Sequence, residues 1–180
     1  MHFDPRQPAS AAIVVRAALG DRASLDHLLR AIQTPLYEHI AFILAHRDAA
    51  SDVLQDVLLT VCRSLIGLTD PTLVRAWVFR IATRAALRAS RRVRARQTVA
   101  LDDIPELATQ TDGDPPFDAE LIDALPALVS ELPACGIVVR LRYLEELTLA
   151  EVAEALDVPV GTVKSRAAYG VALLRRRLAR

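Results

Sequence analysis

The sequence has little of what disulfide-bonded, metal-binding or catalytic chains usually contain. Its two cysteines, Cys62 and Cys135, are far apart and have no paired histidine nearby. A disulfide framework or a zinc site needs closer or more numerous ligands, so we expect two buried thiols in a reducing compartment. The four histidines are scattered, and no nucleophile–base pair or glycine-rich phosphate loop accompanies them. These absences predict a protein that is not an enzyme and that uses no cofactor, metal or small-molecule substrate.

Aromatic residues and glycines are also scarce. The chain has 4% aromatic residues and six glycines, whereas 52% of its 180 residues are hydrophobic. Most of these are leucine, valine and alanine, and since alanine and leucine favour helices we predict an all-α fold of one ordinary domain or two small ones. The N-terminus lacks a basic segment followed by an apolar one, and no uncharged stretch is suited to span a bilayer. We therefore expect a cytoplasmic protein without membrane insertion.

The net charge is zero, but the charges are distributed unevenly. Residues 75–96 hold eight arginines and no acid, residues 97–133 hold nine acids and no base, and residues 158–180 hold six basic residues and no acid. Exposed charges act over about 8–10 Å before salt screens them. Each basic stretch can therefore bind a polyanion although the whole chain is neutral. The alternative is that both stretches are solvated helix faces balanced by an acidic loop.

Residues 9–96 have the periodicity of helices, within a first module over residues 1–96. Pro35 is suited to the first position of a helix over Leu36–Ala45, and Asp48 or Ser51 is suited to cap the next helix. Residues 67–72 combine Gly, Asp and Pro and predict a loop. Residues 97–118 combine acids, Pro and Gly without any period and predict a flexible acidic linker.

The helix after Asp48 has two different faces. Its apolar residues recur at i, i+3, i+4 spacing and predict a buried stripe: Val53, Leu54, Val57, Leu58, Val61, Cys62 and Leu65. The opposite face carries two acids, an amide and one leucine: Asp52, Gln55, Asp56 and Leu59. One leucine on a polar face is common, but it also suits a docking surface.

A long helix is predicted from about Leu73 to Ala95. Its arginines form a ridge that repeats every four residues and then continues: Arg80, Arg84, Arg88, Arg91 and Arg92. Like charges at i, i+4 spacing destabilise a helix by a few tenths of a kcal/mol per pair, so an anionic partner is the simplest reason for the ridge. Trp77 belongs either to the core of this module or to a surface that stacks on bases.

The second module, residues 119–180, contains a predicted helix-turn-helix. Thr148 and Glu151 have the spacing of a capping box that opens a short helix, whose buried face is predicted to be Val152, Ala153 and Leu156. Asp157-Val158-Pro159 breaks the chain, Val160-Gly161 is predicted to form the turn, and Thr162 is suited to start a second helix. The second helix of such a motif enters the major groove, and its first turn contacts the bases; here that turn holds Lys164, Ser165 and Arg166. The alternative is a helical hairpin without affinity for DNA.

Two motifs in these modules resemble a known family. The stretch D-x-x-x-D-V-L-Q-D-V at Asp48–Val57 and the stretch V-P-V-G-T-V-K-S-R at Val158–Arg166 look like regions 2 and 4 of extracytoplasmic-function (ECF) sigma factors. Leu73–Ala82 and Leu132–Ala153 are similar to the segments before the −10-reading helix and at the start of region 4. The resemblance covers roughly residues 25–96 and 120–178, in the order and spacing of the family.

The resemblance implies a role for each part of the chain. Residues 1–96 would bind core RNA polymerase and the −10 element, residues 119–180 the −35 element, and an anti-sigma factor would close around both modules. The polymerase surface would consist of Asp52, Gln55, Asp56 and Leu59. The −10 surface would consist of Trp77, Arg80, Arg84, Arg88, Arg91 and Arg92, with the loop over 68–72. The −35 surface would consist of Thr162, Lys164, Ser165, Arg166 and Tyr169.

The chain departs from the family pattern at three places. Ala134-Cys135-Gly136 replaces residues that are usually charged, Glu145-Glu146-Leu147 replaces the usual E-G-L, and Ala167–Val171 lacks a bulky residue and further arginines. Gly170 within a helix costs about 1 kcal/mol relative to alanine. Two other functions therefore remain as alternatives: a helix-turn-helix repressor or activator, and a sigma-like mimic that titrates an anti-sigma factor.

Overall fold

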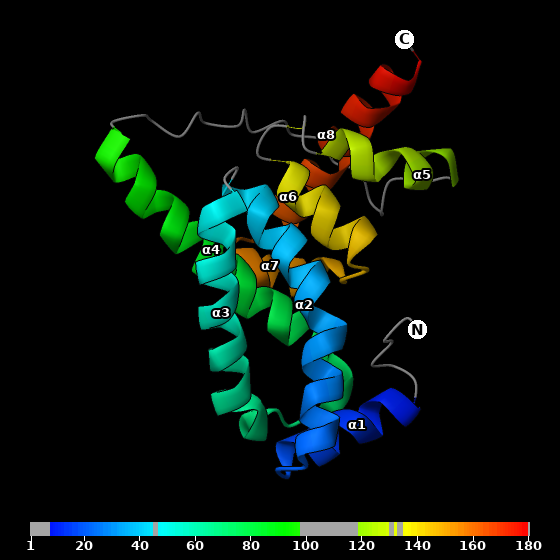
Figure 1. Ribbon diagram of the computed structural model, residues 1–180. Coiled ribbons are helices and arrows are strands. Elements are labelled where there is room, and N and C mark those ends of the chain that lie inside the picture. The colour runs from blue at the N-terminus through cyan, green and yellow to red at the C-terminus, as the bar shows by residue number, and fades with distance from the viewer. Residues whose placement is uncertain (1–7, 45–46, 98–118, 130–131, 133–134, 180) are drawn as a thin grey trace. The chain divides into compact units, whose positions relative to one another are not determined.

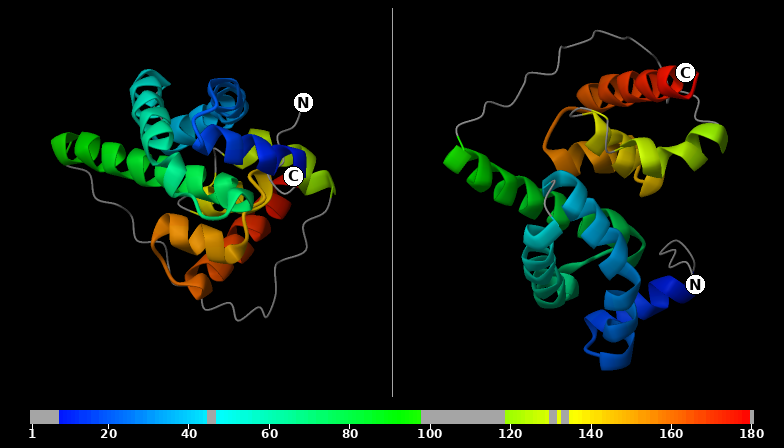
Figure 2. Two further views of the ribbon diagram at one scale, coloured as in Figure 1. Left: turned by 90° about the horizontal axis from the view of Figure 1, so that it is seen from below. Right: turned by 45° about the horizontal axis from the view of Figure 1, so that its top comes forward.

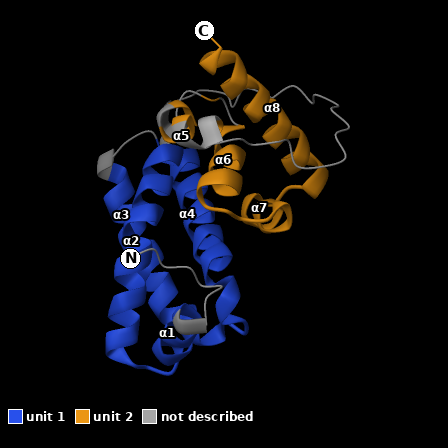
Figure 3. Ribbon diagram, turned by 90° about the vertical axis from the view of Figure 1, so that its right-hand side faces the viewer, with its two compact units in different colours: residues 1–99 blue, residues 100–180 orange. Residues whose placement is uncertain are grey.

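The computed structural model describes residues 8–44, 47–97, 119–129, 132 and 135–179, and every element in these ranges is helical (Figure 1). The prediction of an all-α fold is confirmed. The chain divides into two compact units, residues 1–99 and 100–180 (Figure 3). The predicted linker over 97–118 falls almost entirely outside the described residues. Within the described residues, no helix is both long and apolar enough to cross a bilayer.

The first unit is built around α2 (Arg22–Leu44). This helix packs against α1 (Pro8–Ala18), α3 (Arg47–Ser64) and α4 (Val74–Gln97). Asp21 precedes α2, and the Ser24 backbone N–H donates to Asp21 Oδ2 at 3.0 Å. The hydrogen bonds from the Ser24 hydroxyl and amide hold the pKa of Asp21 below its ordinary value. The carboxylate therefore accepts a hydrogen bond from one of the backbone N–H groups that have no partner within the first turn of a helix.

The prediction that Pro35 opens a helix is wrong, because α2 runs through Pro35 without a break. A proline inside a helix costs about 3 kcal/mol, since its N–H is missing and its ring crowds the preceding turn. Every fourth residue of α2 is buried, both before and after Pro35 in the sequence: Leu28, Ile32, Leu36, Ile40 and Leu44. Burying each Leu or Ile contributes about 1.5–3 kcal/mol. The continuous stripe therefore outweighs the proline.

The α3 helix begins at Arg47, so neither Asp48 nor Ser51 stands before its first residue as a cap. Its inner face is close to the predicted stripe, with Leu54, Val57 and Val61 buried, and Leu65, directly after the helix, is buried as well. Cys62 is exposed, which contradicts the expectation of two buried thiols. It lies about 100° around the helix from Val61, at the edge of the stripe, where none of the described helices covers it. Cys135 is buried as expected, and burial raises the pKa of its thiol.

The predicted loop between α3 and α4 is more ordered than expected. It consists of two 3₁₀ turns, η1 (Leu65–Gly67) and η2 (Pro71–Leu73), on either side of a short extended stretch. Asp70 Oδ1 accepts hydrogen bonds from the Thr72 N–H at 2.8 Å and from the Thr72 hydroxyl at 2.6 Å. These bonds lower the pKa of Asp70. The cap therefore persists at neutral pH and is lost only as the pH falls through that lowered pKa.

The second unit contains α5 (Ala119–Leu128), α6 (Gly136–Val139), the π-helical turn η4 (Arg140–Leu144), α7 (Leu149–Leu156) and α8 (Val160–Leu178). The long helix α8, orange to red in Figure 2, packs against α5, α6 and α7. The core between these helices is made of aliphatic side chains, the largest of them Leu121, Leu125, Leu141, Leu147 and Leu174.

Gly170 of α8 lies directly against Val139 of α6. A Cβ atom at Gly170 would overlap Val139 Cγ2 and would lie 3.6 Å from Cys135 Sγ. The small residues at 135 and 170, two of the departures from the family pattern, thus meet in space. Gly170 costs helix propensity, but in exchange it allows the two helices to pack side by side.

Candidate nucleic-acid interface

The predicted arginine ridge lies on the solvent side of α4. The opposite side of this helix is buried and consists of Val74, Val78, Phe79, Ala82, Thr83 and Ala86. Arg84, Arg88, Arg91 and Arg92 are exposed, and Arg80 is half-buried. The structure therefore gathers all five predicted arginines on one cationic helix face.

Trp77 is half-buried and is not part of the core of the first unit. Arg80 and Arg84 follow it at i+3 and i+7, so the indole shares the face of the arginine ridge. Part of the indole is thus at the surface, and base stacking by Trp77 stays a prediction. An aromatic ring among arginines can stack on a base while the cations face the phosphates.

A buried polar contact fixes α4 against α2. His39 Nε2 in α2 lies 2.8 Å from Thr83 Oγ1 in α4, and both side chains are buried. The His39 ring also meets Phe79 edge-on, with ring centroids 5.3 Å apart. A hydrogen bond inside the core has a preferred direction, so it sets the rotation of α4 as well as its distance from α2. The arginine face is therefore held in one orientation on its unit.

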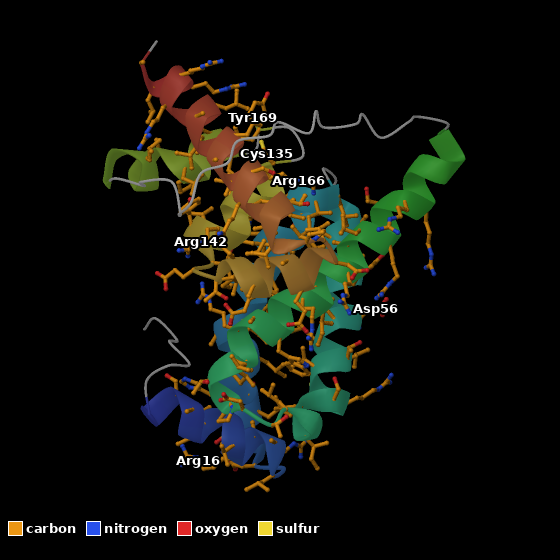
Figure 4. All side chains as sticks on the ribbon, turned by 180° about the vertical axis from the view of Figure 1, so that it is seen from behind. Arg16, Asp56, Cys135, Arg142, Arg166 and Tyr169 are labelled. Carbon is orange, nitrogen blue, oxygen red and sulfur yellow. The ribbon has the colours of Figure 1, made fainter. Side chains whose placement is uncertain are left out.

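The predicted polymerase surface on α3 is exposed along its whole length. Asp52, Gln55, Asp56 (Figure 4) and Leu59 all face solvent, and Leu59 is 46% exposed. Cys62 lies three residues beyond Leu59 and borders the same surface. The structure brings these four predicted residues together on one side of a helix.

The predicted helix-turn-helix is present, and its capping box is confirmed. The Glu151 N–H donates to Thr148 Oγ1 at 3.2 Å, while Glu151 Oε2 accepts from the Thr148 N–H at 2.7 Å. The α7 helix ends at Leu156, and the next residue, Asp157, adopts a left-handed conformation with φ 58°. Aspartate tolerates this conformation better than most residues, so the turn is compact.

The second helix of the motif begins earlier than predicted. We expected Val160-Gly161 to form the turn, but α8 begins at Val160, directly after Pro159. The left-handed residue that turns the chain is Asp157, so no glycine conformation is needed at Gly161. Lys164, Ser165 and Arg166 consequently lie in the second turn of α8. The predicted buried face of α7 is also shifted: Val152 and Ala153 are buried, Leu156 is half-buried, and Ala155 is buried in addition.

All five predicted contact residues of α8 are half-buried: Thr162, Lys164, Ser165, Arg166 and Tyr169. Arg166 and Tyr169 project from one helix at i, i+3 spacing (Figure 4). By contrast, Ala167, Gly170 and Val171 are buried against the rest of the unit. The departure from the family pattern at Ala167–Val171 thus falls mainly on the packing side of α8. Sequence reasoning did not select Arg175, Arg176 and Arg177, which are exposed at the end of α8, although the charge count had marked that stretch.

These features define a class of protein. A capped helix, a left-handed turn and a second helix with basic residues make a DNA-binding helix-turn-helix, and a separate unit presents an arginine-rich helix face. Among the described residues, no group of His, Cys, Asp and Glu is arranged to hold a metal ion. The chain is a two-unit helical DNA-binding protein.

Comparison with known proteins identifies the family. Residues 137–176 match the family "Sigma-70, region 4". The ECF RNA polymerase sigma factor SigL of Mycobacterium tuberculosis is 31% identical over 165 residues, which cover 88% of this chain and 91% of SigL. SigW of Bacillus subtilis is 26% identical over 88% of this chain and 91% of its own length. The chain belongs to the ECF family of RNA polymerase sigma factors. The family predicted from the two motifs is thereby confirmed, and with it a non-enzymatic protein whose partners are core RNA polymerase and DNA.

A solved structure has the same fold. CnrH, in complex with the cytosolic domain of CnrY, superposes with a TM-score of 0.62 at 20% identity. The match covers 94% of this chain and 96% of the CnrH chain. At 20% identity, this structural similarity is evidence for the fold only.

Proposed function

We propose that the two units divide promoter recognition between them. The first module, residues 1–96, binds core polymerase through α3 and the −10 element through α4, while the second module, residues 119–180, binds the −35 element through α8. One observation carries the proposal: two compact units of one sigma factor each present a helix with basic residues at its surface. A single DNA-binding module would need only one of them.

The α4 surface suits a separated DNA strand. Single-stranded nucleic acid is bound by aromatic rings that stack on bases and by cations along the backbone, and this face offers Trp77 with Arg80, Arg84, Arg88, Arg91 and Arg92. Arginine also makes paired hydrogen bonds to phosphate that lysine cannot make. The ordered turn capped by Asp70 stands directly before this helix.

The α8 surface suits duplex DNA. Lys164 and Arg166 can donate to guanine edges in the major groove, the hydroxyl groups of Thr162 and Tyr169 can donate to phosphates, and the Ser165 oxygen can accept from a base amino group. The Ser165 hydroxyl donates within the helix to the Thr162 carbonyl at 3.0 Å, which fixes its side chain. Because Ala167, Gly170 and Val171 are packing residues, their small size does not argue for a mimic that has lost DNA binding.

We further propose that an anti-sigma factor holds this protein inactive in the cytoplasm. CnrH, which has the same fold, was solved with the cytosolic domain of CnrY. A connection as long as residues 97–118 allows two units to close around a partner or to separate when it leaves.

Run-off transcription tests the proposed function directly. Purified protein and core polymerase are incubated with a promoter library, and the transcribed templates are sequenced. We expect transcripts only when both proteins are present, from templates that share two spaced elements. Tight, specific duplex binding by the protein alone, without stimulated transcription, would instead indicate a repressor or activator. Binding to an anti-sigma factor with no transcription would indicate a mimic.

Cys62 provides a probe of the polymerase surface. Since Cys62 is exposed and Cys135 is fully buried, a bulky maleimide should label one position, next to Leu59. We expect core polymerase to protect Cys62, and the adduct to weaken core binding about tenfold or more, as expected for a group that blocks an interface. The measurements are the rate of labelling and the affinity for core polymerase.

The control is a Cys62→Ser, Gln33→Cys variant, in which the exposed thiol lies on α2 instead. Labelling of this variant should leave core binding unchanged. Equal labelling rates of Cys62 with and without bound core polymerase would show that the α3 face is not the docking surface.

A further inference from the structure

The segment of residues 145–147, between η4 and the N-cap residue of α7, is fixed at three points. The Arg140 guanidinium lies 3.3 Å from Glu145 Oε1. The Leu147 N–H donates to the Leu141 carbonyl at 3.1 Å, and the Leu147 carbonyl accepts from Arg142 Nη1 at 3.2 Å. Thr148, the cap of α7, follows directly. The direction in which α7 leaves this segment is therefore set by η4.

This segment holds a backbone conformation that L-residues rarely adopt. Glu146 has φ 54°, in the left-handed region, where the family pattern E-G-L has a glycine. A side chain there is strained, so the surrounding contacts have to maintain it. The hydrogen bonds of Leu147 on one side and the ion pair of Glu145 on the other side do so.

The helical segment formed by α6 and η4 also contacts α8, the second helix of the helix-turn-helix. Helix α6 continues without a break into η4, and Val139 packs against Gly170 of α8. One continuous helix thus contacts α8 at its middle and fixes the segment that leads into α7. The position of both helices of the helix-turn-helix depends on Gly136–Leu144.

The ion pair between Arg140 and Glu145 is expected to contribute little to the free energy of unfolding. Their side chains are only 10% and 5% exposed, so both charges have lost most of their hydration. Replacing such a pair by apolar residues of similar volume is often neutral or stabilising. A guanidinium–carboxylate contact is formed in only a few geometries, so it fixes the orientation of the segment that carries it. Packing between two apolar side chains is not directional and cannot fix that orientation.

We infer that Arg140, Glu145 and Arg142 are positioning residues, which hold the loop before α7 so that α8 meets the −35 element in the correct register. This inference rests on the proposed function of α8. Although Arg140 and Arg142 are basic, their role is to bind the protein's own loop, and Arg140 is too deeply buried to reach DNA.

The experiment compares stability with −35 discrimination in the full-length protein. Discrimination is the ratio of run-off transcription, with core polymerase, on a promoter selected by the wild type and on the same promoter with its −35 block replaced. The single variants Arg140→Met and Glu145→Leu should each lower the unfolding midpoint, because a buried charge loses its partner. The double variant should regain a midpoint near that of the wild type, yet lose about tenfold in discrimination, comparable to one mismatched base pair.

Two further variants complete the design. Arg142→Met removes the bond to the Leu147 carbonyl, together with the cation–π contact of Arg142 with Tyr143, and should reduce discrimination even if the double variant does not fold. The matched control is Arg30→Met with Asp26→Leu, which removes an exposed i, i+4 pair in the first unit and should change neither measurement.

Wild-type discrimination in the folded double variant, or in Arg142→Met where the double variant does not fold, would overturn the inference. A wild-type protein that is indifferent to the −35 block would refute the proposed function of α8, and this inference with it. The two failures are therefore distinguishable.

Discussion

Replacement of Arg84, Arg88 and Arg91 by glutamine is expected to lower run-off transcription at least about a hundredfold, while binding to core polymerase stays unchanged. Each arginine is exposed on α4, and the loss of three charge-assisted contacts worth about 1 kcal/mol or more each accounts for a change of this size. Glutamine keeps the helix propensity, so the effect should come from the lost charge and not from unfolding.

Salt dependence separates this effect from a general loss of activity. When the logarithm of the binding constant for a single strand is plotted against the logarithm of the salt concentration, the slope is about −0.7 per neutralised phosphate. The loss of three phosphate contacts should therefore reduce the magnitude of this slope by about 2. The matched control is Arg16→Gln, Arg22→Gln, Arg30→Gln, which removes the same charge from exposed positions on α1 and α2. If both triple variants lose activity equally, net charge and not the α4 surface would be responsible.

Gly170→Ala is expected to destabilise the second unit by about 1–3 kcal/mol, although alanine is the better helix former. The added Cβ would overlap Val139 Cγ2, so α6 and α8 would have to move apart. Gly161→Ala in the same helix meets nothing within 4 Å and should be neutral or slightly stabilising. This pair isolates the effect of packing, because the chemical change is the same at both positions.

Hydrogen exchange of the backbone amides in the full-length protein tests this prediction for each unit separately. Exchange in α8 should speed up in Gly170→Ala, whereas exchange in α2 should stay as in the wild type. Shortening the neighbour as well, in Val139→Ala with Gly170→Ala, should restore part of the protection. Slower exchange in Gly170→Ala than in the wild type would show that helix propensity outweighs the contact.

Local patterns in the sequence determined much of this protein. The all-α class, the long arginine-rich helix and the capping box at Thr148 depend on interactions within one or two helical turns, so the sequence alone predicts them. The exposed face with Asp56 and Leu59 was predicted for the same reason, since its period is that of a helix. The two motifs with their spacing sufficed to identify the family.

Tertiary contacts decided what local patterns could not. Pro35 remains inside α2 because other helices cover the stripe on both sides of it, and Cys62 is exposed because none of the described helices covers its edge of α3. The reason for Gly170 lies in Val139, which is distant in sequence. In each case the outcome depends on a neighbour brought close only by folding, and that neighbour cannot be read from the period of a single helix.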